Sequence, residues 1–161
     1  MNALTAVRVV SIVCAGLLAG LYVGYRAGVY QALQGLTPSS FVQFQQILHR
    51  YYAAFLPFLV LAALLTTFGW LVMIRSQWRT AEFRLIAASA CGIALIAVVT
   101  RLVNVPLNNL LMTWNVADPP SNLKVVWEPW DRVNTIRTIL AAVVFILEVV
   151  AVNLRAAIDH S

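Results

Sequence analysis

Polar side chains that could bind an anion or an oxygen-rich ligand gather where an apolar segment ends. Residues 101–114, RLVNVPLNNLLMTW, directly follow the apolar run LIAASACGIALIAVVT. At 100° per residue, Arg101, Asn104 and Asn108 fall within about 60° of one another on a helix. A guanidinium group pairs with anions, and an asparagine amide both donates and accepts hydrogen bonds. Such a stripe predicts a polar site at the end of a hydrophobic helix.

Two other segments carry a stripe of the same kind. These stripes consist of Trp130, Asn134 and Arg137, and of Gln43, Gln46 and Arg50. An arginine in the middle of a membrane span costs about 2.5–3.5 kcal/mol on insertion scales, so such residues normally face protein or water. We therefore expect the three stripes to meet inside the protein. His49 lies about 100° from Arg50 on the same helix and is the candidate proton acceptor at this level.

The elements that must position these side chains are membrane helices. Hydrophobic residues make up 61% of the 161 positions, charged residues make up 11%, and the mean hydropathy is +0.83. Soluble domains have about 45–50% apolar and about 25% charged residues. Four segments, at about 7–30, 52–74, 85–105 and 135–154, are long enough to cross a hydrocarbon core of about 30 Å. We predict an all-α, four-helix transmembrane bundle that forms a single domain over residues 1–161.

The direction of each span decides which polar residues can meet. With four spans, Arg26, Arg50, Arg101 and Arg137 fall on the same side of the membrane. The other side holds both termini and the short loop RSQWRTAEFR, and short arginine-rich loops favour the cytoplasm. The full count of lysine and arginine residues on the two sides does not decide the orientation. The count favours one side once the arginines within or beside the spans are left out. We then predict a multi-pass protein of the cell membrane with both termini in the cytoplasm.

A polar pocket is expected in the half of the bundle that is remote from the termini. Pro106 removes one backbone donor and leaves a carbonyl near residue 102 for asparagine amides or water. The longest connection runs from about residue 115 to 128, and Glu128 and Pro129 are expected to open the fourth helix. Trp127 and Trp130 then lie near the interface, where tryptophan is favoured. The connection between the third and fourth helices, which contains tryptophan and proline, would roof the pocket.

The first two spans carry packing and capping signals. A ridge of small residues at a spacing of four consists of Gly16, Gly20, Gly24 and Gly28. This ridge suits close helix packing in lipid, within the bundle or in a homo-oligomer, and it favours a retained helix over a cleaved signal peptide. In TPSSFVQFQQILHRYY, Thr37 is the expected N-cap and Pro38 the first helical residue, so the second helix begins ahead of its span.

Structural roles remain open for several polar residues. Arg26 and Arg50 could reach phosphate head groups. Arg132 and Arg137 could form ion pairs with the neighbouring carboxylates of the fourth helix, and Asn134 could make a helix-to-helix hydrogen bond.

Acidic and cysteine residues within the spans predict structure rather than chemistry. Glu148 is expected to pair with Arg8 or Arg155 near the side of the termini. Cys14 and Cys91 lie in apolar spans without CxxC spacing, so neither a disulfide framework nor a zinc site is indicated. A haem needs axial histidines, and a copper or iron site needs several His, Cys, Met or carboxylate ligands. The pattern therefore predicts neither a metal nor a cofactor.

The basic charge indicates a lipid partner. The pI is about 9.8, but the basic residues lie in or beside the spans rather than in one soluble patch. Anionic membrane lipid is the simpler partner, and no nucleic-acid binding is expected.

Two motifs resemble the signature of a known family. They are R-x-x-N-x-P-x-N-N-x-x-x-x-W at 101–114 and W-x-x-W-x-R-x-N-x-x-R at 127–137. Both are similar to the signature of small four-helix integral membrane proteins of unknown function, a family that includes the anthrone oxygenases. The resemblance implies oxidation of a phenolic or enolic polycyclic substrate, such as an anthrone, by molecular oxygen without metal or flavin.

The resemblance also implies roles for the polar stripes. The implied catalytic residues, which would hold an oxyanion or accept a proton, are Arg101, Asn104, Asn108, Arg137 and His49. The candidate substrate-binding residues are Gln46, Arg50, Trp114, Trp127, Trp130 and Asn134. The three tryptophans would form a slot for the rings, and Asn134 would donate to oxygen atoms.

A non-catalytic interpretation uses the same arginines to grip a lipid head group or another anion, as a membrane subunit or binding module. A catalytic pocket predicts that the polar side chains point into one closed cavity, whereas a lipid site predicts that they open toward the bilayer. Transport is disfavoured because the inner halves of the first three spans are almost wholly apolar.

Overall fold

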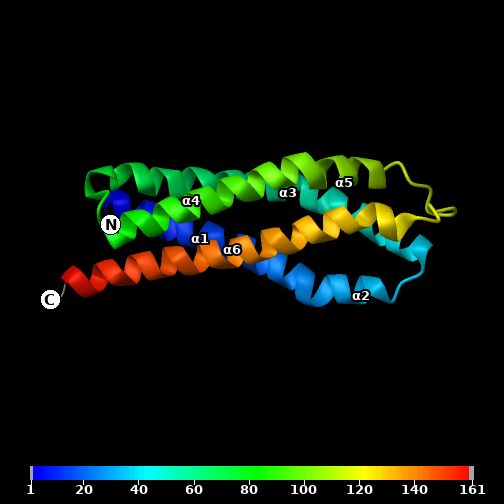
Figure 1. Cartoon of the computed structure of the whole chain (residues 1–161), viewed down its shortest axis with the longest axis horizontal. Helices are drawn as coiled ribbons and strands as arrows, with labels where there is room; N and C mark the ends of the chain where they lie inside the picture. Colours follow the sequence, from blue (N-terminus) through cyan, green and yellow to red (C-terminus); the bar gives the residue numbers. More distant parts are fainter. Residues whose placement is uncertain (1, 160–161) are drawn as a thin grey trace.

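The computed structural model describes residues 2–159, with side chains described through Leu154. Within this range, four helical segments are long and apolar enough to cross a membrane: Ala3–Gln34, Pro38–Met73, Ala81–Leu111 and Leu123–Leu154. They lie side by side along one long axis (Figure 1). The first segment begins and the last one finishes at the same end of the bundle, which we call the terminal end. The opposite end is the distal end. The all-α, four-helix membrane fold is thus confirmed.

A π-helical turn interrupts the first and the third of these segments. The first consists of α1 (Ala3–Gly24), the π turn η1 (Tyr25–Val29) and α2 (Tyr30–Gln34). The third consists of α4 (Ala81–Val99), the π turn η3 (Thr100–Asn104) and α5 (Val105–Leu111). The second and fourth are the single helices α3 (Pro38–Met73) and α6 (Leu123–Asp159), and the 3-10 turn η2 (Arg75–Gln77) follows α3. Both π turns belong to the distal half, and such turns are frequent at functional sites.

Polar side chains cap the starts of three helices. Asn2, Thr37 and Thr80 each accept a hydrogen bond from the backbone amide three residues further on. Pro38 takes the first position of α3, as the sequence predicts, because a proline there gives up an amide that has no helical partner anyway. These caps satisfy donors that would otherwise be unpaired at the helix ends.

The helices extend beyond the predicted spans at most of their ends. The predicted ranges 7–30, 52–74, 85–105 and 135–154 cover the most apolar part of each helix, whereas the helices begin up to fourteen residues earlier and run up to six residues further. The difference arises because hydropathy marks the hydrocarbon core, while packing and capping decide where a helix begins and ends.

The prediction that Glu128 and Pro129 open the fourth helix is wrong. Helix α6 begins at Leu123 and contains Pro129 in its second turn. Leu123, Trp127 and Trp130 are buried on one face, and the stripe continues at spacings of three and four through residues 134, 137, 141, 144, 148 and 151. Burial of this continuous stripe stabilises the helix upstream of the proline and overrides the local cost of the missing amide.

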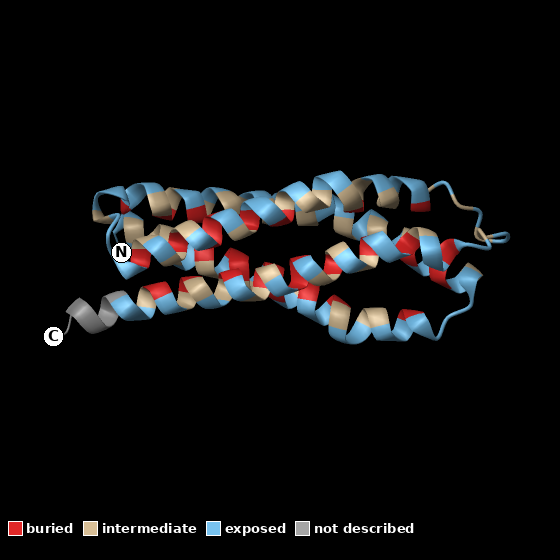
Figure 2. Cartoon of the chain, viewed as in Figure 1, coloured by how far each residue is buried: buried red, intermediate tan, exposed pale blue. Residues whose placement is uncertain are grey.

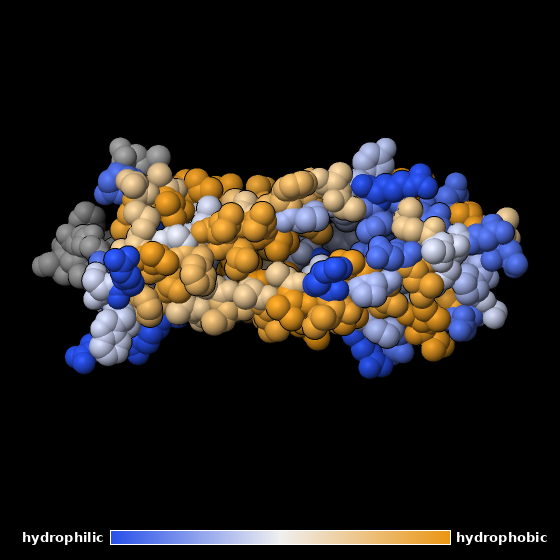
Figure 3. Space-filling view, turned by 90° about the horizontal axis from the view of Figure 1, so that it is seen from above, coloured by the Kyte–Doolittle hydropathy of each residue, from blue (hydrophilic) through white to orange (hydrophobic). Residues whose placement is uncertain are grey.

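The bundle is a closed ring of helices around one core. Helix α6 packs between α1 and α4, and α3 packs between the same two helices on the other side. Buried and exposed residues alternate along each helix, so each helix has a buried and an exposed face (Figure 2). On the face shown in Figure 3, the surface is apolar around its middle and hydrophilic at both ends, as a protein surrounded by hydrocarbon requires.

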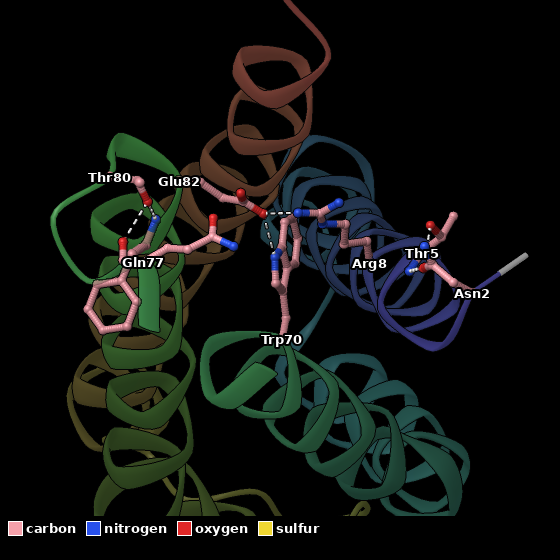
Figure 4. Close-up of polar contacts among 8 residues, drawn as sticks. Asn2, Thr5, Arg8, Trp70, Gln77, Thr80 and Glu82 are labelled. Atoms are coloured by element: carbon pink, nitrogen blue, oxygen red, sulfur yellow. Dashed lines mark hydrogen bonds and ion pairs between the residues drawn. The ribbon is translucent and has the colours of Figure 1, made fainter. Parts of the chain in front are cut away.

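An ion pair ties α1, α3 and α4 together at the terminal end (Figure 4). The Arg8 guanidinium donates to Oε1 of Glu82, and the Trp70 indole nitrogen donates to the same oxygen at 2.9 Å. The Arg8 guanidinium also lies 5.6 Å from the centre of the Trp70 ring. The pair is mostly buried, so it fixes the relative positions of three helices where the chain leaves the apolar layer.

Glu148 does not pair with Arg8, contrary to the sequence prediction. Its carboxylate is fully buried and accepts hydrogen bonds from Ser11 at 3.0 Å and from Thr67 at 2.8 Å. The hydroxyl oxygens of Ser11 and Thr67 are also 3.0 Å apart. The pairing with Arg8 is wrong because Arg8 is held by Glu82, and the pairing with Arg155 stays a prediction because that side chain lies outside the described residues.

The glycine ridge divides into an internal and an external part. A Cβ atom at Gly16 would lie 3.0 Å from the ring of Phe145, so this glycine permits close packing of α1 on α6. A Cβ atom at Gly20, Gly24 or Gly28 would meet nothing within 4 Å. These three glycines lie on the outer surface, and self-association through them stays a prediction.

Candidate functional site

A cavity of about 410 Å³ lies in the distal half of the bundle. Its walls come from α1, η1, α3, the α4–η3–α5 segment and α6, and most of the lining is apolar. Helix α3 supplies the largest share, with apolar residues between Leu48 and Leu64. Ligand pockets typically have about 300–1,000 Å³ and mainly apolar walls with a few placed polar groups. The cavity is therefore large enough for a small organic molecule.

The structure brings part of the predicted site to this cavity. Six of the predicted site residues line it: His49, Arg101, Asn108, Trp130, Asn134 and Arg137. The lining does not include Gln46, Arg50, Asn104, Trp114 or Trp127. The two arginines of the lining have different positions, because Arg137 is 4% exposed whereas Arg101 is exposed at the surface.

The π turn η3 explains why Arg101 and Asn104 differ in exposure. The amide of Val105 donates to the carbonyl of Thr100, five residues back, so the turn is wider than an α-helical one. Pro106 follows immediately, and a proline ring clashes with the carbonyl four residues before it, which the wider turn relieves. The 100° spacing used on the sequence does not hold across this turn. Asn104 is consequently buried while Arg101 points to the mouth of the cavity.

The asparagines of the third segment hold α6 in place. The Trp130 indole nitrogen donates to Oδ1 of Asn108 at 2.7 Å, and Nδ2 of Asn104 donates to the carbonyl of Trp130 at 3.3 Å. Both bonds end at one residue, which fixes the depth and rotation of α6 beside η3 and α5. Asn104 is thus a positioning residue for Trp130, and Asn108 both positions it and lines the cavity.

The distal end of the cavity is closed by aromatic rings. Trp127 stacks on Trp130 with the ring centres 4.8 Å apart, and Trp114 meets Trp127 edge-on at 6.1 Å. Phe41 contacts the other side of Trp127 at 6.2 Å. Trp114 and Trp127 therefore support Trp130 from behind, and Trp130 alone of the three forms part of the cavity wall.

Helix α3 does not turn the predicted stripe of Gln43, Gln46 and Arg50 toward the cavity. A different face of the helix lines it. Gln43 and Arg50 are exposed. Gln46 donates to the carbonyls of Leu111 and Trp114, at 2.9 and 3.0 Å, and so satisfies the last turn of α5. The predicted stripe consists of polar residues alone, whereas the face of α3 that lines the cavity contains both polar and apolar residues.

Three buried residues of the lining that carry polar groups were not predicted from the sequence: Tyr22, Tyr25 and Gln45. Gln45 donates to the hydroxyl of Tyr25 at 2.9 Å, and the Tyr25 ring lies 5.7 Å from the ring of Trp130. Both Gln45 and Tyr25 are at most 5% exposed. The signal that could have found Gln45 is its spacing of three and four from the large apolar residues Phe41, Val42 and Leu48.

The buried charged group of the cavity lining is the guanidinium of Arg137. It lies over the ring of Tyr22 with 4.4 Å to the ring centre, and among the described residues it makes no hydrogen bond or ion pair. Nδ2 of Asn134 and the hydroxyl of Tyr22 are also buried without a hydrogen-bond partner in the described chain. These three side chains share one wall of the cavity.

The cavity opens between α3 and the α4–η3–α5 segment. Ala53, Pro57 and Leu61 on one side of the opening and Arg101 on the other are exposed. Figure 3 shows the surface hollowed where its apolar middle meets the hydrophilic distal end. Because residues 53–61 belong to the apolar span of α3, the opening faces hydrocarbon at this level.

Two other distal arginines have carboxylate partners, whereas Arg50 is exposed and has none among the described residues. Arg26 pairs with Asp131 at 2.9 Å and lies 4.0 Å from the centre of the Tyr30 ring. Arg132 pairs with Glu128 at 2.5 Å, one turn away on α6. Within the described part of the chain, no group of three or more His, Cys, Asp or Glu residues could hold a metal ion.

Comparison with known proteins places the chain beside one family. The family model described as anthrone oxygenase matches residues 44–147, which is more than half of the 161 residues. The match includes α4, η3, α5 and all the α3 and α6 residues of the cavity lining. No curated protein and no solved structure matches the chain.

Proposed function

Because this chain belongs to the anthrone oxygenase family, we propose that it is an oxygenase that acts on a phenolic or enolic polycyclic substrate in the distal cavity. An anthrone, a ketone with a methylene group between two aromatic rings, has the required chemistry. We place the protein in the cell membrane with both termini in the cytoplasm. Its substrates are then hydrophobic molecules dissolved in the bilayer, together with molecular oxygen.

The observation that carries the proposal is the combination of apolar walls with one cationic, amide-containing wall in the distal cavity. The cavity is not closed, although a closed cavity is expected of a catalytic pocket; it opens toward hydrocarbon, as expected of a lipid site. The same opening would admit a hydrophobic substrate from the bilayer. Apolar and aromatic side chains suit the rings of the substrate. Guanidinium and amide groups suit the oxygen on which negative charge develops, and a water-poor site strengthens that interaction.

The proposed reaction begins with loss of a proton from the methylene group, which leaves an enolate. The enolate passes one electron to oxygen, and recombination of the two radicals forms a carbon–oxygen bond and a hydroperoxide. Loss of water then yields the quinone. Overall, the methylene carbon loses two hydrogens and gains one oxygen atom, while the second oxygen atom leaves as water, so the four electrons lost by carbon reduce O2 completely.

The proposed roles follow from the positions of the side chains. Arg137 and Asn134 stabilise the enolate oxygen, and His49 accepts the methylene proton. Arg101, at the mouth, stabilises the anion from the open side, and Asn108 donates to oxygen atoms of the substrate.

The remaining predicted site residues act indirectly in this proposal. Asn104 and Gln46 position the wall through their bonds to backbone carbonyls. Trp114 and Trp127 hold Trp130 against the rings of the substrate. Arg50, which is exposed outside the lining, attracts anionic substrate or lipid to the surface.

Oxygen uptake tests the proposal directly. Wild-type protein purified in detergent is mixed with emodin anthrone, and uptake is compared with that of Arg101→Leu and of Arg132→Gln, an exposed arginine outside the cavity. We expect uptake above the spontaneous rate, a loss of about tenfold or more in Arg101→Leu, and no change in Arg132→Gln. Uptake equal to the spontaneous rate for the wild type would refute an oxygenase acting on this substrate, and full turnover by correctly inserted Arg101→Leu would remove that residue from the mechanism.

A second candidate function is the binding of an amphiphilic anion without turnover. The opening toward hydrocarbon favours it, and so does the exposed Arg101 at the mouth, which has no carboxylate partner among the described residues. A lipid could place its head group there and its chain in the cavity. Co-purified lipid identified by mass spectrometry, together with absent oxygen uptake, would support this function over the first.

A further inference from the structure

Arg137 is a buried cation that lacks a counter-ion. It is 4% exposed, and no carboxylate among the described residues lies within ion-pair distance. The nearest acidic residues of α6 have other partners, since Asp131 holds Arg26 and Glu128 holds Arg132. A buried charge without a partner costs several kcal/mol, and such residues in membrane proteins mark ligand or ion sites. None of the described carboxylates supplies the missing anion, which points to a ligand from outside the chain.

The surroundings of Arg137 also lack hydrogen-bond partners. Nε of Arg137, Nδ2 of Asn134 and the hydroxyl of Tyr22 are buried and unpaired among the described residues. The guanidinium carbon lies over the Tyr22 ring, 4.4 Å from its centre, so the charge also rests against an aromatic face. Few buried polar groups in native proteins are unpaired, and a cluster at a cavity wall points to an absent ligand.

The rest of the cavity indicates the shape of that ligand. Four aromatic rings line it, from Tyr22, Tyr25, Tyr52 and Trp130, and the other walls are largely aliphatic. Aromatic pairs prefer stacked or edge-to-face contact, so a planar aromatic body fits these walls better than a flexible chain. A phosphate or another small hydrophilic anion would leave most of the apolar surface without contact.

We propose that Arg137 is the counter-ion of a bound aromatic phenolate or enolate, with Asn134 and Tyr22 as neutral hydrogen-bond partners of the same oxygen. This deepens the proposed function, on which the choice of ligand class rests. The oxygen and nitrogen atoms of the Asn134 side-chain amide interchange when the amide group is flipped, so Nδ2 can face the ligand. Arg101 lies at the mouth and is not the primary counter-ion.

The test measures binding, without oxygen consumption or turnover. The probe is emodin, a hydroxyanthraquinone that changes colour when it ionises, and its fully O-methylated ether is the control ligand that cannot ionise. Affinity is followed by quenching of tryptophan fluorescence, because Trp130 lines the cavity. The visible spectrum reports the ionisation state of bound emodin. We expect wild-type protein to bind emodin as the phenolate at neutral pH, more tightly than the ether.

The variant Arg137→Gln removes the charge. We expect the phenolate spectrum to disappear and emodin affinity to fall about tenfold or more, with unchanged affinity for the ether. The matched control is Arg132→Gln, which removes one positive charge from the exposed side of the same helix and should bind as the wild type does. If Arg137→Gln does not insert into the membrane, the same binding measurements are made on Arg137→Lys and on the isosteric Tyr22→Phe. We expect both variants to bind emodin more weakly than the wild type.

Three outcomes would overturn the proposal. The first is a phenolate spectrum and affinity in Arg137→Gln equal to those of the wild type. The second is the absence of emodin binding to the wild type. The third is Arg137-dependent binding of dodecanoate in place of emodin, which would assign the site to a lipid carboxylate. Phenolate binding without oxygen uptake would refute the proposed function alone, so the two failures are distinguishable.

Discussion

At the scale of single residues, ion pairing distinguishes three arginines that support the fold from the two that line the cavity. Arg8, Arg26 and Arg132 each contact a carboxylate, which explains them as fold stabilisers. Arg101 and Arg137 have no carboxylate partner among the described residues and line the distal cavity. The carboxylate partners of Arg8 and Arg26 come from other helices, 74 and 105 positions away, so sequence spacing has no information about those pairs.

Replacement of Glu148 should affect stability rather than the distal site. Glu148→Leu removes the acceptor of two buried hydroxyl groups, and we expect a loss of about 1–3 kcal/mol in the free energy of unfolding. Glu148→Gln keeps one carbonyl acceptor and should lose clearly less. Unfolding by SDS titration measures both, and equal losses in the two variants would contradict the hydrogen-bond explanation.

At the scale of elements, the π turns decide what the distal half presents to the cavity. Turn η3 places Asn104 toward α6 and leaves Arg101 at the opening, and η1 contains the buried Tyr25 that accepts from Gln45. Continuous α-helices would carry different residues to the cavity, because each π turn shifts the angular position of everything after it. In the terminal half, regular helices pack closely through small residues instead.

Close packing of α4 on α6 should depend on Gly92. A Cβ atom at this position would lie 2.7 Å from Cγ2 of Val144, and a branched side chain has little freedom to move away. Gly20 is the matched control, because a Cβ atom there meets nothing within 4 Å. Both changes to alanine gain about 1 kcal/mol of helix propensity, and Gly92→Ala adds about 1–3 kcal/mol of overpacking strain.

Thermal unfolding in detergent measures this difference. We expect Gly20→Ala to unfold at a higher temperature than Gly92→Ala. Equal unfolding temperatures would show that α4 and α6 separate at little cost, contrary to the packing of the structure.

At the scale of the whole molecule, the apolar belt and the hydrophilic ends define two membrane sides. Both termini and the η2 turn are at one end, and the long connection between α5 and α6 is at the other (Figure 1). The arginine-rich loop at the terminal end favours the cytoplasm. In this orientation the cavity opens toward the outer half of the bilayer.

Labelling of single cysteines tests the orientation. Ser76 and Ser121 are exposed, at the terminal and the distal end respectively. In a variant whose Cys14 and Cys91 are replaced by alanine, Ser121→Cys should react with a membrane-impermeant maleimide on intact cells. Ser76→Cys should react only after the membrane is permeabilised. The reverse pattern would place the termini outside.

Several features follow from the sequence alone, because they depend on average physical properties of segments. The number of spans and their approximate places follow from hydropathy, since about 20 apolar residues cross a bilayer whatever their partners. The Thr37 and Pro38 start of α3 follows from local capping chemistry. The motif residues at 101–114 and 127–137 indicated the family that the match over 44–147 shows.

Other features depend on contacts between distant segments and were decided by the tertiary structure. The start of α6 at Leu123 depends on burial against other helices, which outweighs the local preference of Pro129. The exposure of Arg101 and the burial of Arg137 depend on a π turn and on neighbouring helices, because a helical stripe does not specify which side faces protein. The sequence alone determined the fold and the polar half of the bundle, whereas packing alone decided which guanidinium lies unpaired inside it.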